Sequence, residues 1–396
     1  MKWLTRLLTL LGFLSVFLTA AFFGLGPQWV DRASNRVVGD PGRRPTLETL
    51  ALHKELIVGD LHADSALWGK ELLVQNNHGQ VDLPKLLEGG ATLQMFTTVT
   101  KSPQGQNYEH NASDAPDNIS ILALAQRWPA ETQHSLFARA ILQADRVLAA
   151  VQQHPQLTLV RSRSDLSALL AKRQAGDIVV GALLGTEGSH ALDGDMGNIK
   201  KLYTAGFRMM SLQHFFDNQL GGSLHGESQS GLTSFGREAV TKMQALNIMI
   251  DVSHSSEATV RDTLETTQGA ALIVSHTGFQ GHCPSSRNIS DQTMEMIAEA
   301  GGLIGVGFWA DVTCGKDITA ITNAIRYGID RFGLDHIALG SDWDGSVTTP
   351  IDASQLPHLT QALVDAGFTV AEIRAVMGGN LVRFLGEHLP PLYLHI

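Results

Sequence analysis

The sequence predicts an α/β protein whose main domain is a (β/α)8 barrel. Short apolar runs alternate with longer segments of helical periodicity along the 396-residue chain, and eight of these runs are typical of β-strands. Most of these runs end in a histidine or an acidic residue. No glycine-rich dinucleotide-binding motif follows an early strand, which disfavours the alternative, a doubly wound open sheet.

The apolar runs give the order of the expected elements. The eight strands are expected at 56–61, 92–99, 179–185, 208–213, 248–252, 272–275, 303–308 and 337–340. The segments between them repeat apolar residues at helical spacing, and several begin with Ser or Asp and end with Gly or Asn, as capped helices do. The longest helical segment is expected over 120–154. The run "LTLVRSRSDLSALLAK" adds a possible small strand and helix before the third barrel strand.

Residues 1–25 are set apart from the barrel. Lys2 and Arg6 precede an uncharged apolar run about as long as the ~20 residues that cross a bilayer. We favour an uncleaved anchor over a removed signal peptide, because "LTAAFF" is a poor cleavage site. Either reading places the rest of the chain outside the cytoplasm, in the periplasm or on the extracytoplasmic face of the membrane. Residues 26–45 are expected to be a linker and 46–396 the barrel domain.

Composition and charge exclude several classes of protein. The chain is 43% hydrophobic and 17% charged, which is typical of a globular protein and not of a disordered one. Its net charge is −10 and it has no Lys/Arg cluster, so we expect no binding to nucleic acid through a basic patch. The two cysteines, Cys283 and Cys314, could form a disulfide in an exported protein or remain free buried thiols.

Ionisable side chains stand at the C-terminal ends of six expected strands. They are His62 and Asp64 after the first strand, Glu187 after the third, His214 after the fourth, His254 after the fifth, His276 after the sixth, and Asp342 and Asp344 after the eighth. In a barrel these ends open on one face, where active sites are built. Each residue also has a structural alternative, because a lone histidine is more often hydrogen-bonded within the fold and an acidic residue can cap a turn or a helix. Six strand ends of this kind favour a shared metal site.

The ligand types indicate the metal. Imidazoles and carboxylates without cysteine suit Zn²⁺, with Mn²⁺, Fe²⁺ and Co²⁺ as alternatives. The five expected ligands are His62, Asp64, Glu187, His254 and His276. Five ligands are too many for one catalytic zinc that keeps an open position, and they suit two metals that share a carboxylate. Two such ions polarise a substrate oxygen and lower the pKa of water to about 7, so the sequence predicts metal-assisted hydrolysis.

Nine stretches, from about residue 56 to about residue 385, resemble the membrane dipeptidases of the renal dipeptidase type, a branch of the amidohydrolase superfamily. In chain order they are "DLHADS", "GQVDLPKLLEGG", "GTEGSHALDGD", "SLQHFFDN", "GLTSFGREAV", "IDVSHSS", "IVSHTG", "SSRNISD" and "GSDWDG". The ordered set is specific, whereas a lone HxD is a weak signal. The resemblance implies a zinc-dependent dipeptidase in which a metal-bridging hydroxide attacks the peptide bond, with dipeptides carrying a C-terminal D residue among the possible substrates.

The resemblance also implies a role for each matching residue. The implied ligands are His62 and Asp64 for the first zinc, Glu187 as the bridge, and His254 and His276 for the second zinc. His214 matches a histidine that contacts the scissile carbonyl or its oxyanion. Arg287, in "SSRN", matches the arginine whose planar fork binds the free carboxylate of the substrate. Asp342 matches the acid and base that takes a proton from the water and gives one to the leaving amine.

Further expectations concern the surroundings of this site. The resemblance implies a disulfide between Cys283 and Cys314 that closes a loop beside Arg287, and it favours a homodimer. The segment 100–118 differs from the animal enzymes, resembles bacterial members of the family, and could reshape the substrate side of the pocket. The loop 218–236 could cover the substrate, with His225 and Glu227 either as contacts or, as an alternative, as solvated loop residues.

Two alternative functions are considered beside the dipeptidase. One is another binuclear-metal hydrolase on the same scaffold, such as an N-acyl amino acid deacylase or a lactonase, and a requirement for a free amino terminus would separate the two. The other is a non-catalytic, membrane-tethered binding protein, which the filled ligand positions disfavour.

Overall fold

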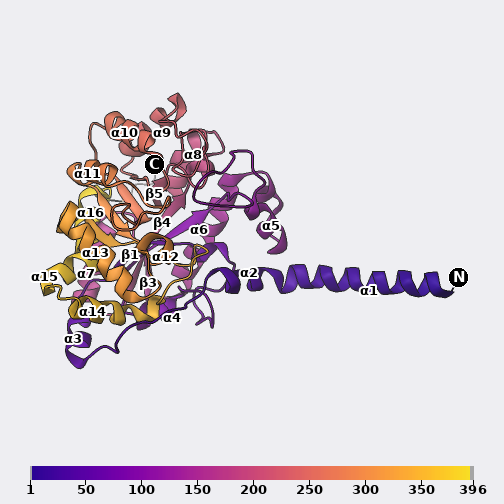
Figure 1. The fold of residues 1–396 in the computed structure, drawn as a ribbon, viewed down its shortest axis with the longest axis horizontal. Helices are drawn as coiled ribbons and strands as arrows, with labels where there is room; N and C mark the ends of the chain where they lie inside the picture. Colours follow the sequence, from indigo (N-terminus) through magenta and orange to yellow (C-terminus); the bar gives the residue numbers. More distant parts are fainter. Residues whose placement is uncertain (1, 393–396) are drawn as a thin grey trace.

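A closed parallel barrel lies at the centre of the computed structural model, which describes residues 2–392 (Figure 1). Its strands are β1 (Gly59–Ala63), β2 (Leu93–Val99), β4 (Val180–Glu187), β5 (Phe207–Ser211), β6 (Met249–Asp251), β7 (Ile273–Thr277), β8 (Leu303–Val306) and β9 (Ile337–Leu339). β2 pairs with β4, and β1 pairs with β9, which closes the sheet. The predicted eight-stranded barrel is confirmed, with strand ends shifted by a few residues.

Helices surround the barrel (Figure 1). They include α3 (Leu47–Glu55), α4 (Leu83–Glu88), α8 (Gly197–Ala205), α9 (Ser234–Ala245), α10 (Glu257–Thr266), α11 (Asp291–Glu299), α12 (Ala310–Thr313), α13 (Ile318–Phe332), α14 (Leu356–Asp365), α15 (Val370–Arg374) and α16 (Asn380–His388). Several begin at a polar cap, as the sequence predicts; the Thr233 side chain accepts a hydrogen bond from the first turn of α9, and Ser256 does the same for α10.

The segment between β2 and β4 differs in one respect from the prediction. The small extra strand and helix are present as β3 (Leu157–Leu159), which pairs with β4 outside the barrel, and α7 (Arg163–Gln174). The single long helix expected over 120–154 is wrong, because the segment divides into α5 (Asn118–Ala125), a 3-10 turn and α6 (Leu136–Gln153). Pro129 precedes the turn; it has no N–H to donate and disfavours helical backbone in the residue before it.

The N-terminal end of the barrel is closed by apolar side chains. Residues near the strand starts, among them Leu93 and Leu303, form one buried cluster with Leu381 and Phe384 of α16. A Cβ at Gly59 of β1 would lie 2.7 Å from a methyl group of Leu381, so a larger residue there would displace that side chain. With this end filled by hydrocarbon, the polar side chains are confined to the opposite end, where the strands finish.

The N-terminal segment consists of two helices. α1 (Lys2–Gly24) extends away from the barrel, has no buried residue, and is the one helix in residues 2–392 long and apolar enough to cross a membrane (Figure 1). This helix suits a signal or anchor sequence, and the disulfide described below is consistent with a location outside the cytoplasm. The expected linker begins with α2 (Gly26–Ser34), which is attached to the barrel. Its Asp31 is buried and forms an ion pair with His78 at 3.1 Å.

Asp344 holds the loop that follows β9. Its carboxylate accepts hydrogen bonds from Ser65 Oγ and Lys70 Nζ, both at 2.6 Å. It also accepts from the backbone N–H groups of Gln80, at 2.7 Å, and Val81, at 3.2 Å. Asp344 is fully buried and joins the loops after β1 and β9, so its role is structural.

We expect Asp344→Ala to lower the free energy of unfolding by about 3–5 kcal/mol, because the Lys70 ammonium would stay buried without its carboxylate. Urea unfolding of the full chain in a mild detergent, followed by circular dichroism, measures this. Asp365→Ala is the matched control: it breaks the exposed ion pair with Arg43 and should cost about 1 kcal/mol or less. Equal losses in the two variants would contradict the role given to Asp344.

A buried histidine makes stability depend on pH. His53 of α3 is hydrogen-bonded through Nδ1 to Thr360 Oγ1 at 2.7 Å and through Nε2 to the Gly89 carbonyl at 2.9 Å. Burial lowers the pKa of His53. Below its ordinary pKa of about 6.5 the unfolded chain therefore binds more protons at this residue, so stability falls as pH falls.

We expect the free energy of unfolding to fall between pH 7.5 and 5 in the unchanged protein. In His53→Gln this fall should be smaller, by up to about 1.4 kcal/mol per pH unit. The measurement is urea unfolding at each pH for both proteins. His110→Gln, at an exposed position, is the control and should leave the pH dependence as it is in the unchanged protein.

Candidate metal centre and substrate cavity

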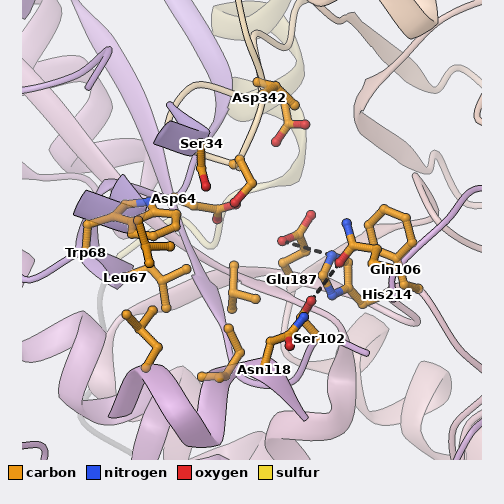
Figure 2. Close-up of a pocket in the computed structure, with 18 of the residues that line it drawn as sticks. Ser34, Asp64, Leu67, Trp68, Ser102, Gln106, Asn118, Glu187, His214 and Asp342 are labelled. Atoms are coloured by element: carbon orange, nitrogen blue, oxygen red, sulfur yellow. Dashed lines mark hydrogen bonds and ion pairs between the residues drawn. The ribbon is translucent and has the colours of Figure 1, made fainter. Parts of the chain in front are cut away.

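Seven ionisable side chains meet at the C-terminal end of the barrel. They are His62, Asp64, Glu187, His214, His254, His276 and Asp342, and none is more than 7% exposed. All except His62 line one cavity of about 520 Å³, in which Glu187 occupies the centre (Figure 2). The structure thus brings together every residue that the sequence predicts as a metal ligand or as a catalytic group.

Two strands depart from regular register at the histidines they carry. The pairing of β1 with β2 shifts between Asp60 and Ala63, on either side of His62. The pairing of β7 with β8 shifts between Val274 and Thr277, on either side of His276. Such irregularities re-aim a side chain that simple alternation would place elsewhere. In consequence His62 reaches Glu187, whereas Asp60, two residues earlier, does not line the cavity.

Glu187 is shared by two groups of possible metal ligands. One group contains His62, Glu187, His276 and Asp342, and the other contains Glu187, His214 and His254; donor atoms within each group lie within 4.8 Å of one another. Glu187 Oε1 lies 3.3 Å from His254 Nε2, 3.4 Å from His276 Nε2 and 3.5 Å from His62 Nε2. Glu187 Oε2 lies 3.4 Å from His214 Nε2.

The grouping differs in two ways from the predicted ligand set. Asp64 stands outside both groups, although its Oδ1 lies 3.5 Å from His62 Nε2 and accepts a hydrogen bond from Thr97 at 2.6 Å. His214 and Asp342, expected to act on the substrate, fall inside the groups. Two overlapping groups with one shared carboxylate are consistent with a binuclear metal site.

The state of the ring nitrogens fits a bound cation. His62 Nε2 is buried without a hydrogen-bond partner, and His254 Nε2 and His276 Nε2 lie 3.0 Å apart. Burial lowers the pKa of His254 and His276, so both rings are neutral near pH 7 and can offer lone pairs. Burial also acts against a charged His62, but Asp64 and Glu187 outweigh it and raise the pKa of His62 to about 10. The position beside His62 Nε2 therefore favours positive charge.

Asp251 orients two of these rings, and sequence reasoning missed it. Its carboxylate accepts hydrogen bonds from the N–H of Ser275, at 2.9 Å, and from Ser275 Oγ, at 2.8 Å. Ser275 Oγ in turn lies 3.0 Å from His62 Nδ1 and 2.9 Å from His276 Nδ1. Since the serine hydrogen is given to Asp251, the network assigns N–H to both Nδ1 atoms, so Nε2 is the ligand atom of each ring. On His62 a metal would take the place of the Nε2 proton that the raised pKa favours. A buried acid before "VSH" was the available signal.

Asp342 occupies a position fixed by its neighbours. The preceding residue, Ser341, donates to Asp60 through its N–H at 2.7 Å and its Oγ at 2.9 Å. The backbone of Asp342 is left-handed, with φ of 60°, and a Cβ at Gly345 would lie 2.0 Å from Asp342 Oδ1, so only glycine fits there. Burial, assisted by Asp64, raises the pKa of Asp342 to about 8.

His214 has one ring nitrogen tied to the backbone. Its Nδ1 lies 3.0 Å from the carbonyl oxygen of Lys101, so Nδ1 carries the proton and Nε2 faces Glu187. Burial lowers the pKa of His214 to about 4. The Nε2 atom is thus placed beside the shared carboxylate and on the cavity wall.

Arg287 is buried at the cavity wall and is held by backbone oxygens. Its Nη1 donates to the Ser253 carbonyl at 3.0 Å, and its Nη2 donates to the His276 carbonyl at 2.9 Å. The guanidinium also lies over the Trp309 ring, 5.5 Å from its centroid. Arg287 is 1% exposed, so the alternative of a surface ion pair is excluded.

The predicted disulfide is present. Cys283 and Cys314 are bonded, and they join the loop after β7 to the end of α12. Asn288, next to Arg287, donates to the Cys283 carbonyl at 2.9 Å and to the Val312 carbonyl at 3.1 Å. The bridge and the amide together brace the loop that carries Arg287.

Of the two segments expected near the substrate, only one lines the cavity. Segment 100–118 contributes Ser102, Gln106, Tyr108 and Asn118. The Tyr108 hydroxyl accepts a hydrogen bond from Trp309 Nε1 at 3.2 Å. No cavity-lining residue among those described comes from loop 218–236. That loop's His225 is buried behind the cavity wall against Phe215, and its Glu227 is exposed.

Comparison with known proteins agrees with these findings. Residues 47–389 match the family model described as membrane dipeptidase, peptidase family M19. The chain is 26% identical over 350 residues to dipeptidase aclJ of Aspergillus oryzae, covering 83% of this chain and 77% of the relative. It is 29% identical over 332 residues to dipeptidase 3 of Mus musculus, covering 77% of this chain and 62% of the relative.

Solved structures show the same fold. The probable dipeptidase PvdM of Pseudomonas aeruginosa has a TM-score of 0.71 at 18% identity, covering 86% of this chain and 98% of that one. A metallopeptidase of Rhodobacter sphaeroides, solved with a phosphinate mimic of L-Ala-D-Ala, has a TM-score of 0.67 at 23% identity, covering 84% and 99%. Because the family match spans most of the chain and contains the whole metal centre, the protein belongs to the membrane dipeptidase family, peptidase family M19.

Proposed function

We propose that this metallopeptidase is an exported, zinc-dependent dipeptidase. The observation that carries the proposal is the placement of Glu187 between two groups of ligands with Arg287 on the same cavity wall. His62, Asp64, Glu187, His254 and His276 would hold two zinc ions, because neutral imidazoles and carboxylates are the ligands that zinc prefers in catalytic sites. When bound, the ions would lower the pKa of water and polarise the scissile carbonyl.

Different residues around the metal centre act on different parts of the dipeptide. Arg287 binds the C-terminal carboxylate, since its guanidinium is prepositioned by carbonyl groups and faces the cavity. His214 orients the scissile carbonyl through Nε2. Because Nδ1 already donates to the Lys101 carbonyl, donation from Nε2 as well requires a doubly protonated ring, which burial opposes by lowering the pKa of His214 to about 4. The negative charge that develops on the carbonyl oxygen would favour that second proton as the reaction proceeds.

Asp342 moves the proton. Its raised pKa, about 8, favours the protonated carboxyl near neutral pH, which is the form that can give a proton to the departing amine. The ionised form would take the proton from the attacking water. The two ends of the dipeptide then have separate partners. Arg287 binds the carboxylate end, and Asp64 would pair with the free α-amino group as well as with a metal. Because Arg287 contacts His254 and Asp64 contacts His62, the carboxylate end lies toward His254 and the amino end toward His62.

The location and assembly follow as further parts of the proposal. α1 anchors the protein from its N-terminal side, with the barrel outside the cytoplasm, and residues 46–396 act as the catalytic domain. Sedimentation of the detergent-solubilised chain tests the expected homodimer. The deacylase and lactonase alternatives share the metals and Arg287 but would not need a free amino group.

The proposed activity predicts cleavage of free L-L and L-D dipeptides by the zinc-loaded full chain, with N-acetylated dipeptides and a tripeptide left intact. We expect a chelator to abolish the activity, and Asp342→Asn to lower kcat by about 10²–10⁴-fold with little change in KM, because it removes proton transfer but keeps the shape of the side chain. Release of free amino acids, measured by chromatography, decides this. Cleavage of the N-acetylated compounds alone would assign the site to a deacylase.

The hydrogen bond between Asp251 and Ser275 predicts that Asp251 affects metal affinity. We expect Asp251→Asn to weaken zinc binding about 10–100-fold, because Ser275 would no longer be held as an acceptor for the two imidazole N–H groups. Competition with a zinc-binding dye measures the affinity without relying on turnover. Asp262→Asn, at a partly exposed surface ion pair with Arg237, is the control. If both variants bind zinc with equal affinity, Asp251 does not contribute to metal binding.

A further inference from the structure

Helix α2 is fixed against the loop that carries Asp342. The side chain of Asn35, which follows the helix, accepts a hydrogen bond from the Ser346 N–H at 2.8 Å and donates one to Asp31 Oδ1 at 2.7 Å. Asp31 and Asn35 are each 2% exposed, and Asp31 is also paired with His78. This set of contacts, the Asn35 latch, holds α2 on the barrel near the metal centre.

The residues that follow Asn35 are also hydrogen-bonded to the barrel domain. Val38 donates its N–H to the Thr349 carbonyl at 2.9 Å, and Thr349 donates its N–H to the Arg36 carbonyl at 3.0 Å. Residues 26–38 therefore have a defined place beside the loop after β9. They lie outside residues 47–389, which match the family model.

The latch makes α2 one wall of the substrate cavity. Trp29, Val30 and Ser34 of α2 line the same cavity as Asp64, Glu187 and Asp342. Leu67 and Trp68, from the turn after β1, line it as well, and so do apolar side chains of α5, which both α1 and α2 contact. Trp29 is 71% exposed and Val30 38% exposed, so this apolar surface is open to a ligand.

The apolar wall is on the Asp64 side of the cavity. Ser34, Leu67 and Trp68 lie with Asp64 to one side of Glu187, and His214 lies to the other (Figure 2). The His214 ring packs against His254 with centroids 4.9 Å apart, and Arg287 Nη2 lies 3.4 Å from His254 Nε2. Arg287 is thus on the side away from the wall.

We propose that α2 forms a subsite for a large apolar side chain on the N-terminal residue of the dipeptide. The assignment of the N-terminal residue rests on the proposed function, in which Arg287 binds the C-terminal carboxylate. A leucine or phenylalanine side chain there would remove its own surface and that of Trp29 and Val30 from water, whereas glycine would leave the wall hydrated. Selectivity for the first residue is therefore set by a segment that precedes the barrel.

The test compares L-Leu-L-Ala with Gly-L-Ala on the full chain in lipid nanodiscs, with zinc added. The variants are Trp29→Ala combined with Val30→Ala, which removes the wall, and Asn35→Ala, which removes the latch. Trp29 and Val30 are exposed enough that their truncation spares the folded core. Val38→Ala is the matched control, since its side chain is 57% exposed and does not line the cavity.

We expect the wall variant to raise KM for Leu-Ala about five- to tenfold, with kcat little changed and KM for Gly-Ala within about twofold of the unchanged protein. The latch variant should shift the same ratio in the same direction, and Val38→Ala should leave the ratio where it was. If the wall variant cleaves both dipeptides with the original ratio of KM values, the subsite is refuted.

A binding measurement separates this inference from the proposed activity. Calorimetric titration of phosphinate mimics of Leu-Ala and Gly-Ala reports affinity without turnover. If the unchanged protein cleaves neither dipeptide but prefers the Leu-Ala mimic, and the wall variant loses the preference, the dipeptidase proposal fails and the subsite stands. If the unchanged protein binds both mimics equally, or binds neither, the subsite is refuted whatever the activity.

Discussion

The carboxylate of Glu187 is the interaction around which the rest of the site is arranged. It is buried at the end of β4, and imidazole nitrogens from the regions of β1, β5, β6 and β7 lie within 3.5 Å of its two oxygens. A buried carboxylate is costly unless positive charge compensates it. Burial and the nearby Asp64 raise the pKa of Glu187 well above its ordinary value, which shows how strongly this position calls for a cation. A barrel satisfies the requirement because all its strand ends converge on one point.

Carboxylates farther from the cavity determine how the inner side chains are presented. Asp251 acts through Ser275 on two histidines, and Asp60 acts through Ser341 on the start of the loop that carries Asp342. Asp344 joins that loop to the loop after β1. These three residues are buried and hydrogen-bonded to serine hydroxyls, backbone N–H groups or a lysine. Their contribution is orientation, which a metal centre needs because ligand geometry sets both affinity and reactivity.

The N-terminal segment combines two tasks. α1 has the length and apolarity of a membrane-crossing helix, and α2 continues it directly onto the rim of the substrate cavity. Attachment through Asp31 and Asn35 places the cavity close to the C-terminal end of α1. Under the proposed anchoring and the proposed subsite, one short helix would couple the two, and a fragment that begins beyond residue 35 would lack one wall of the cavity.

Much of the fold and the metal centre could be predicted from the sequence, since the information is local. Alternation of apolar runs with helical segments identified the barrel, and His62, Glu187, His254 and His276 were recognisable because each stands at or near the end of an apolar run. The division of 120–154 into two helices was missed, although Pro129 was a visible reason for it. The catalytic role of Asp342, the substrate contacts of His214 and Arg287 and the identity of the metal stay predictions.

The sequence by itself determined the kind of fold and the kind of site, because periodicity reports secondary structure and the parallel barrel gathers its strand ends at one face. Only the tertiary structure decided which atoms meet. Asp344 contacts Ser65 across 279 residues, Asn35 contacts Ser346 across 311, and Ser275 reaches His62 across 213. Such contacts depend on barrel closure and on local register shifts, and neither leaves a pattern in neighbouring residues. For this reason the orienting role of Asp251 and the place of α2 beside the cavity appear only in three dimensions.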